Sequence, residues 1–61
     1  MINALRKKYE AEVAAAKANI DVYINNPEGI GEHPDLVGAM DLEMTKLADA
    51  SDNLATLNSF Y

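Results

Sequence analysis

Glu32, His33 and Asp35 carry metal-ligand side chains and stand close together near the middle of the chain. A divalent cation needs three or four ligands that converge from rigid positions, whereas these three come from one short segment. The same residues suit the start of a helix, because Pro34 fits a first helical position and an acidic side chain stabilises the first turn. We expect His33 at or beside the helix cap, and a metal-dependent activity built on the three residues is the alternative.

The remaining polar residues give no catalytic assignment. The second half of the chain contains the carboxylates of Asp41, Glu43, Asp49 and Asp52, but its pattern predicts no enclosed pocket in which two would face each other. Glu43 and Lys46 suit a surface ion pair at i,i+3. Gly29 and Gly31 lack the Gly-Lys-Ser/Thr continuation of a phosphate-binding loop. We expect no catalytic residue, no cofactor-binding residue, no metal ligand and no cofactor, and hence no enzyme.

Two long helices are expected to hold these side chains in place. Residues 26–33 hold Pro27 and two of the three glycines, which predicts a connecting loop between a helix over about 2–25 and a second over about 34–59. We expect Gly29 to turn the loop and Ile30 to cover the open end of the helix pair. Asn3 could cap the first helix.

Apolar residues follow a helical repeat in the first helix, with steps of three and four. The stripe consists of Ile2, Leu5, Tyr9, Val13, Ala16, Ile20 and either Tyr23 or Ile24. The alanine-rich stretch around Ala14 to Ala18 favours a helix and lets a neighbouring helix come close.

In the second helix, Met40, Leu47, Leu54 and Tyr61 recur every seven residues, which is typical of a coiled-coil seam. We expect Val37 and Met44 to flank this row, with Ser51 and Asn58 interrupting the second row of the seam. Gly38 falls near the first turn, where a close approach is possible. Phe60 and Tyr61 need a burial site if the C-terminus is to be ordered.

The chain is therefore expected to be an all-α, antiparallel two-helix hairpin forming a single domain, residues 1–61. A chain of 61 residues buries only about 60% of its unfolded surface, and its apolar residues exceed what one seam can cover. We expect two copies to form a homodimeric four-helix bundle, in a small structural or interaction protein. The alternative is a monomeric adaptor whose methionine- and tyrosine-bearing face docks a helix of a partner protein.

The composition of the chain limits the classes of binding partner and the cellular compartment that we expect. Ten acidic against five basic residues give a net charge of −5, which disfavours nucleic-acid binding. No apolar run reaches the ~20 residues that span a membrane. The absence of cysteine excludes a disulfide framework, and with no signal-peptide pattern at the N-terminus we expect a cytoplasmic protein.

Two segments, Val22 to Asp35 and Leu47 to Leu54, resemble short helical-hairpin proteins of unknown function encoded by large tailed marine phages. The string from Asn26 to Pro34 is the distinctive part of this resemblance. It implies an accessory or structural protein that works in the cytoplasm of an infected bacterium. The resemblance brings no site residues to carry over. We expect the connecting loop to serve turn geometry, and binding to a partner is the alternative.

Overall fold

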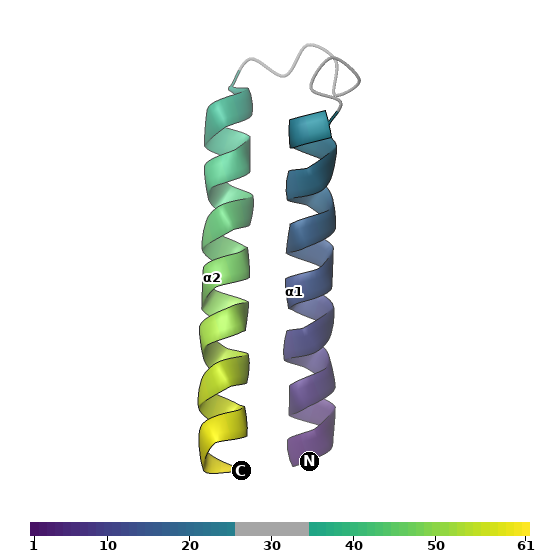
Figure 1. Ribbon diagram of the computed structural model, residues 1–61, viewed down its shortest axis with the longest axis vertical. Coiled ribbons are helices and arrows are strands. Elements are labelled where there is room, and N and C mark those ends of the chain that lie inside the picture. The colour runs from purple at the N-terminus through teal and green to yellow at the C-terminus, as the bar shows by residue number, and fades with distance from the viewer. Residues whose placement is uncertain (26–34) are drawn as a thin grey trace.

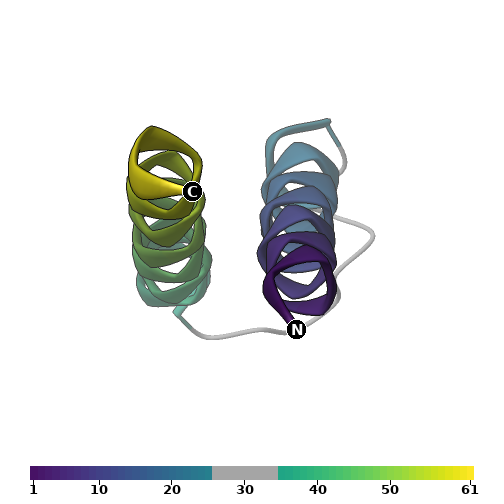
Figure 2. The ribbon, with the colours of Figure 1, turned by 90° about the horizontal axis from the view of Figure 1, so that it is seen from below.

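The computed structural model describes residues 1–25 and 35–61, and these ranges form two antiparallel helices (Figure 1). Helix α1 spans Ile2–Asn25 and helix α2 spans Leu36–Phe60. Both chain termini lie at the same end of the pair, and the end-on view in Figure 2 shows the two helices side by side. The predicted all-α hairpin is confirmed. Neither described helix is long and apolar enough to cross a membrane.

Helix α1 buries the stripe that its sequence predicts, except for Ile2, which is exposed at the first residue of the helix. Ala16 and Ile20 are buried, and Leu5, Tyr9, Val13 and Tyr23 are half-buried. Of the two candidates at its last turn, Tyr23 faces the seam and Ile24 is exposed. Asn3 does not cap the helix, because α1 begins at Ile2 and the Asn3 side chain accepts a hydrogen bond from Arg6 Nη1 (2.6 Å).

Helix α2 begins at Leu36, two residues later than expected, and its cap is Asp35. The Asp35 carboxylate accepts a hydrogen bond from the Gly38 backbone N–H (2.8 Å), which satisfies one of the free amides of the first turn. The expectation of a cap at or beside His33 is therefore wrong. A Cβ atom at Gly38 would collide with the Asp35 carboxylate, so this cap depends on the glycine.

One of the two predicted rows of α2 lies in the seam, and the other does not. Met40, Leu47 and Leu54 are half-buried, as predicted, but Tyr61 is exposed. The second row is Leu36, Glu43, Ala50 and Leu57, one residue before the predicted Val37, Met44, Ser51 and Asn58. A shift of one residue turns a helical position by about 100°. Val37 is consequently 79% exposed and Met44 49% exposed.

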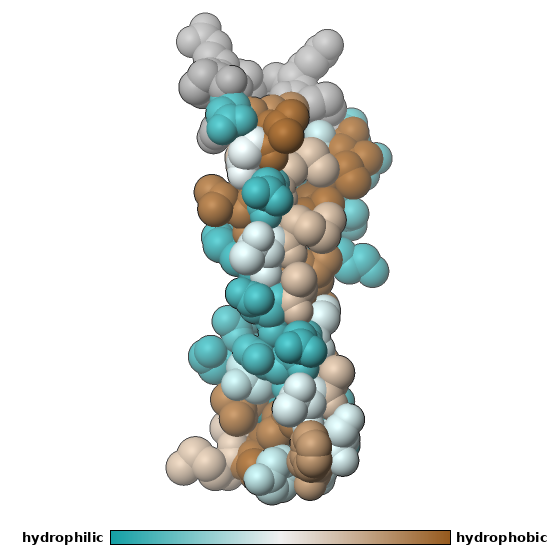
Figure 3. All heavy atoms as spheres, turned by 90° about the vertical axis from the view of Figure 1, so that its left-hand side faces the viewer, coloured by the Kyte–Doolittle hydropathy of each residue, from teal (hydrophilic) through white to brown (hydrophobic). Residues whose placement is uncertain are grey.

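The core of this hairpin is thin. The buried apolar residues among the described ones are Ala16, Ile20, Ala50 and Leu57, and two of these are alanines. Exposed apolar side chains occur toward both ends of the rod, at Val22, Ile24, Val37, Leu42 and Met44 and again at Ile2, Phe60 and Tyr61. Figure 3 shows this on the outer side of α2, where apolar patches near the two ends flank a hydrophilic band.

The expected turn at Gly29, the placement of Ile30 and the loop over 26–33 all lie outside the described residues.

Candidate functional site

A polar contact crosses the seam between the last turns of α1 and the first turns of α2, at a position where a coiled coil normally has an apolar residue. Glu43 belongs to the buried row of α2, and its side chain is only 12% exposed. Its Oε2 accepts a hydrogen bond from the Asn19 side-chain amide of α1 (3.2 Å), and its Oε1 pairs with Lys46 Nζ (3.2 Å). The predicted Glu43–Lys46 pair therefore exists, but Glu43 is a seam residue that also links the two helices.

The same contacts explain the electrostatics of the carboxylate. The hydrogen bond from Asn19 lowers the pKa of Glu43 from its ordinary value, and Lys46 adds to this effect as donor and as positive charge. Desolvation acts in the opposite direction and is outweighed. The lowered pKa keeps Glu43 a carboxylate to a lower pH than an ordinary glutamate, so its side chain is suited to accepting hydrogen bonds and poorly suited to donating a proton.

An open groove of about 320 Å³ runs over this contact on one side of the hairpin. Alanines form its floor, because Ala16 and Ala50 leave room between the helices. Its rim carries both charges and amides, from Glu12, Asn19, Glu43, Lys46, Asp49 and Asn53. We call this side the groove face. Such a groove offers hydrogen bonds and charges of both signs to solvent.

A smaller hollow of about 190 Å³ lies toward the end of the rod that holds the termini. Leu5 and Tyr9 of α1 line it together with Leu57 and the C-terminal Tyr61. Tyr61 is nevertheless 79% exposed, so the aromatic end of the chain lies over this hollow without being buried in it.

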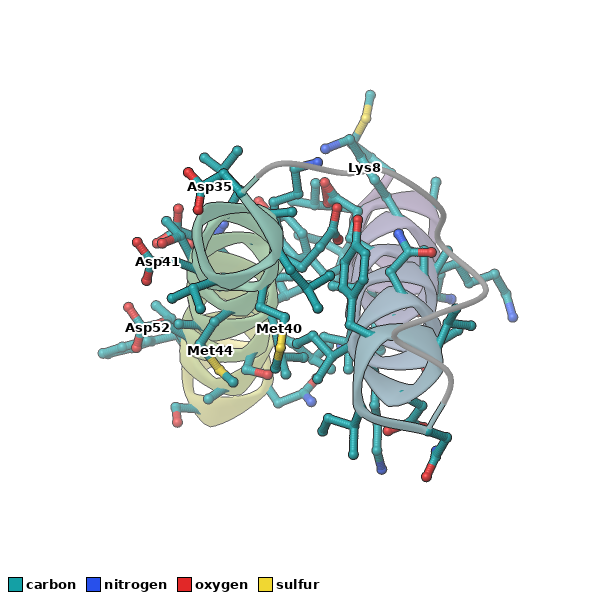
Figure 4. The ribbon with its side chains drawn as sticks, turned by 90° about the horizontal axis from the view of Figure 1, so that it is seen from above. Lys8, Asp35, Met40, Asp41, Met44 and Asp52 are labelled. Atoms are coloured by element: carbon teal, nitrogen blue, oxygen red, sulfur yellow. The ribbon has the colours of Figure 1, made fainter. Side chains whose placement is uncertain are left out.

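The opposite side of the hairpin is different in character. Figure 4 shows Met40 and Met44 of α2 on that side, and Lys8 of α1 on the groove side. Arg6 Nε of α1 donates a hydrogen bond to Asn58 Oδ1 of α2 (2.8 Å), so the outer row of α2 and the Arg6 side of α1 belong to one surface. We call this surface the methionine face.

The alternative metal-ligand cluster stays a prediction, because only one of its three residues is among those that the structure describes. Glu32 and His33 lie outside those residues, and Asp35 is engaged in capping α2. Within residues 1–25 and 35–61, no group of three His, Cys, Asp or Glu side chains is placed to hold a metal ion.

Sequence reasoning missed the role of Asn19, and it placed Glu43 on the surface. A signal was present, because Leu36, Glu43, Ala50 and Leu57 recur every seven residues, three or four away from Met40, Leu47 and Leu54. This signal is weak, because the row contains a carboxylate and an alanine, whereas a coiled-coil seam is usually marked by large apolar residues.

The site and the fold together define the class: a two-helix hairpin with a polar contact in its seam and two unlike faces. No known protein family, no curated protein and no solved structure matches this chain.

Proposed function

We propose that this chain is a small structural or interaction protein without catalytic activity, and that it works by pairing with a second copy to form a four-helix bundle. The observation that carries the proposal is the set of apolar side chains that the hairpin leaves exposed. Val37 and Met44 lie on one side of the first turns of α2, where they are 79% and 49% exposed. Exposed apolar side chains gathered in one region are typical of an interaction surface.

The surface area of the chain supports the same proposal. It exposes 4559 Å², whereas a compact monomer of its mass exposes about 3,900 Å². The excess, about 650 Å², approaches the ~800 Å² that each partner buries in a standard protein interface. An elongated shape of 43 × 15 × 15 Å explains where the excess comes from, since a rod has a long side to cover.

The thin core is a second reason. Two packed helices with four buried apolar side chains have little apolar burial to offset the loss of conformational entropy. Small domains without disulfides or metals are often stabilised by oligomerisation, and this chain contains no cysteine. Covering the exposed apolar residues with a second copy would supply the missing burial.

The biological setting of the proposal rests on sequence. The resemblance to phage-encoded helical hairpins is our reason for proposing an accessory role in the cytoplasm of an infected bacterium. The open, mixed lining of the groove face supports a non-catalytic role, because it does not enclose a substrate away from water.

Light scattering on a sizing column, over a dilution series, tests the proposal. We expect a mass of twice the 6.6 kDa chain that falls toward the single-chain value on dilution. A folded monomer at every concentration would refute self-association. It would favour the monomeric adaptor, whose exposed Met44 side would then dock a helix of another protein.

A further inference from the structure

On the methionine face, α2 presents a stripe of uncharged side chains that is uneven in size, bordered on the outer side of the helix by Asp41 and Asp52 (Figure 4). A stripe with helical spacing runs from Val37 through Met40 and Met44 to Ala48, Ser51 and Ala55, and all of these except Met40 are exposed. Its large side chains stand in the first half of the helix and its small ones in the second half. On the groove face, by contrast, α2 presents Lys46 and Asp49.

The large and small halves of this stripe complement each other when two copies of α2 pack antiparallel. If α2 packs antiparallel to α2 of a second copy, with a two-fold axis near Leu47 and Ala48, each Met44 meets the other copy's Ser51. Each Met40 then meets the other copy's Ala55. Large side chains facing small ones fill an interface, whereas methionines facing methionines would leave the alanine half unfilled.

The charges of α1 on the same face follow a matching pattern. Arg6, Glu10, Lys17 and Asp21 recur with helical spacing, and the last three are exposed. Among the described residues, the ion pairs are Lys8–Glu12 and Lys46–Glu43, and none of these four takes part in them. In an antiparallel pairing of α1 with its own copy, Glu10 meets the other copy's Lys17, and Arg6 meets its Asp21.

The side-chain sizes of α2 and the charges of α1 place the two-fold axis of the dimer at nearly the same level. The hydrogen bonds Arg6–Asn58 and Asn19–Glu43 set the register of the hairpin, and they place Leu47 and Ala48 level with about residues 14 to 17 of α1. The charge pattern of α1 is centred between Val13 and Ala14. The difference is at most about three residues, or ~4.5 Å along the helix.

We infer that two copies pair through their methionine faces with their connecting segments at opposite ends of the bundle, α2 beside α2 and α1 beside α1. This inference rests on the proposed self-association and specifies its surface and direction. The rival arrangement, with both connections at one end, would place the uncharged stripe of α2 against Arg6, Glu10, Lys17 and Asp21. Those charges would then be covered without partners of opposite sign, which is costly.

Distances between spin labels test the arrangement, and the lack of native cysteine makes single-cysteine variants clean. Ser59→Cys and Thr45→Cys both put a label on an exposed position of α2 outside the stripe. With connections at opposite ends, the two labels are separated along the axis by about 35 Å at position 59 but only about 8 Å at position 45. We expect the measured distance at 59 to exceed that at 45 by roughly 15 Å or more.

Each other outcome has a defined meaning. Equal distances at the two positions would overturn the opposite-end arrangement while leaving self-association intact. The absence of any dipolar coupling at both positions would show a monomer, which would refute the proposed function and this inference with it.

Charge exchange gives an independent test of the α1 pairing. Glu10→Lys and Lys17→Glu should each weaken the dimer about tenfold, because each creates two like-charge contacts per dimer. The double variant should return to within about threefold of the original affinity, since it restores both pairs with reversed sign. Asp49→Lys makes the same charge change as Glu10→Lys on the groove face and should leave the affinity unchanged. A double variant as weak as the single ones would overturn the pairing.

Discussion

Two rows of side chains run along α2 one residue apart, and they differ in burial. The inner row, which starts at Leu36, faces α1 even though it contains the carboxylate of Glu43. The outer row, which starts at Val37, remains exposed even though it contains Met44. Direction around the helix therefore decides burial here, more than the hydrophobicity of the individual residue. The comparison also suggests two uses: the inner row holds the hairpin together, and the outer row is free to bind a second copy.

The largest expected effect comes from a charge in the inner seam. Leu47→Asp would place a carboxylate against α1 without a partner, and the cost of desolvating it is several kcal/mol. We expect loss of the cooperative thermal transition, measured by circular dichroism. Thr45→Asp is the matched control, because Thr45 is exposed only two residues away. Similar melting curves for both variants would show that the assignment of the seam is wrong.

A charge in the outer row should separate association from folding. Met44→Asp leaves the contacts of the inner row in place, so the hairpin should keep its helical circular dichroism at high concentration. It should raise the dissociation constant of the dimer at least about tenfold, because it covers a charge in the proposed interface. Sedimentation at several concentrations measures this. An unchanged dissociation constant would remove the methionine face from the interface.

The polar contact in the inner row should make stability depend on pH. The folded-state pKa of Glu43 lies below its ordinary value of 4.5, first because of Asn19 and then because of Lys46. A carboxylate of this kind contributes stability that is present above its unfolded-state pKa and is lost as the pH falls through the folded-state value. The melting temperature should therefore decrease as the pH is lowered below 4.5.

Two variants isolate this contribution. Glu43→Gln removes the titrating group, and Asn19→Ala removes the larger cause of the shift. Both should show a smaller acid-induced decrease in melting temperature than the original chain. If either variant loses as much stability on acidification as the original, Glu43 is not the source.

These cases show how far the sequence predicts this molecule. The two helices and the α1 stripe follow from periodicity, because large apolar residues recur there with little ambiguity. The second row of α2 does not, since Val37 and Met44 are more apolar than Glu43 and Ala50, and only packing against α1 selects between adjacent rows. The link between Asn19 and Glu43 depends on the register of the two helices, which the sequence of neither helix specifies alone.

A smaller effect is expected at the start of α2, where Asp35 and Gly38 act as a unit. Gly38→Ala gains about 1 kcal/mol of helix propensity but displaces the Asp35 carboxylate, whose cap is worth about 1 kcal/mol. The change should be nearly neutral in the original chain and stabilising in the Asp35→Ala background. Denaturant unfolding of the four variants measures the coupling. Equal effects in both backgrounds would show that the cap does not depend on the glycine.

The smallest effect should follow deletion of Phe60 and Tyr61. Both side chains are more than three-quarters exposed, and Tyr61 adds to the helix only the backbone hydrogen bond from its N–H to the Leu57 carbonyl (2.9 Å). The free energy of unfolding should change by no more than about 0.5 kcal/mol. Leu57→Ala, at a buried position of the inner row, should cost about 2 kcal/mol or more. A deletion as costly as Leu57→Ala would mean that the aromatic end is covered in the assembled protein, which would extend the interface beyond the methionine face.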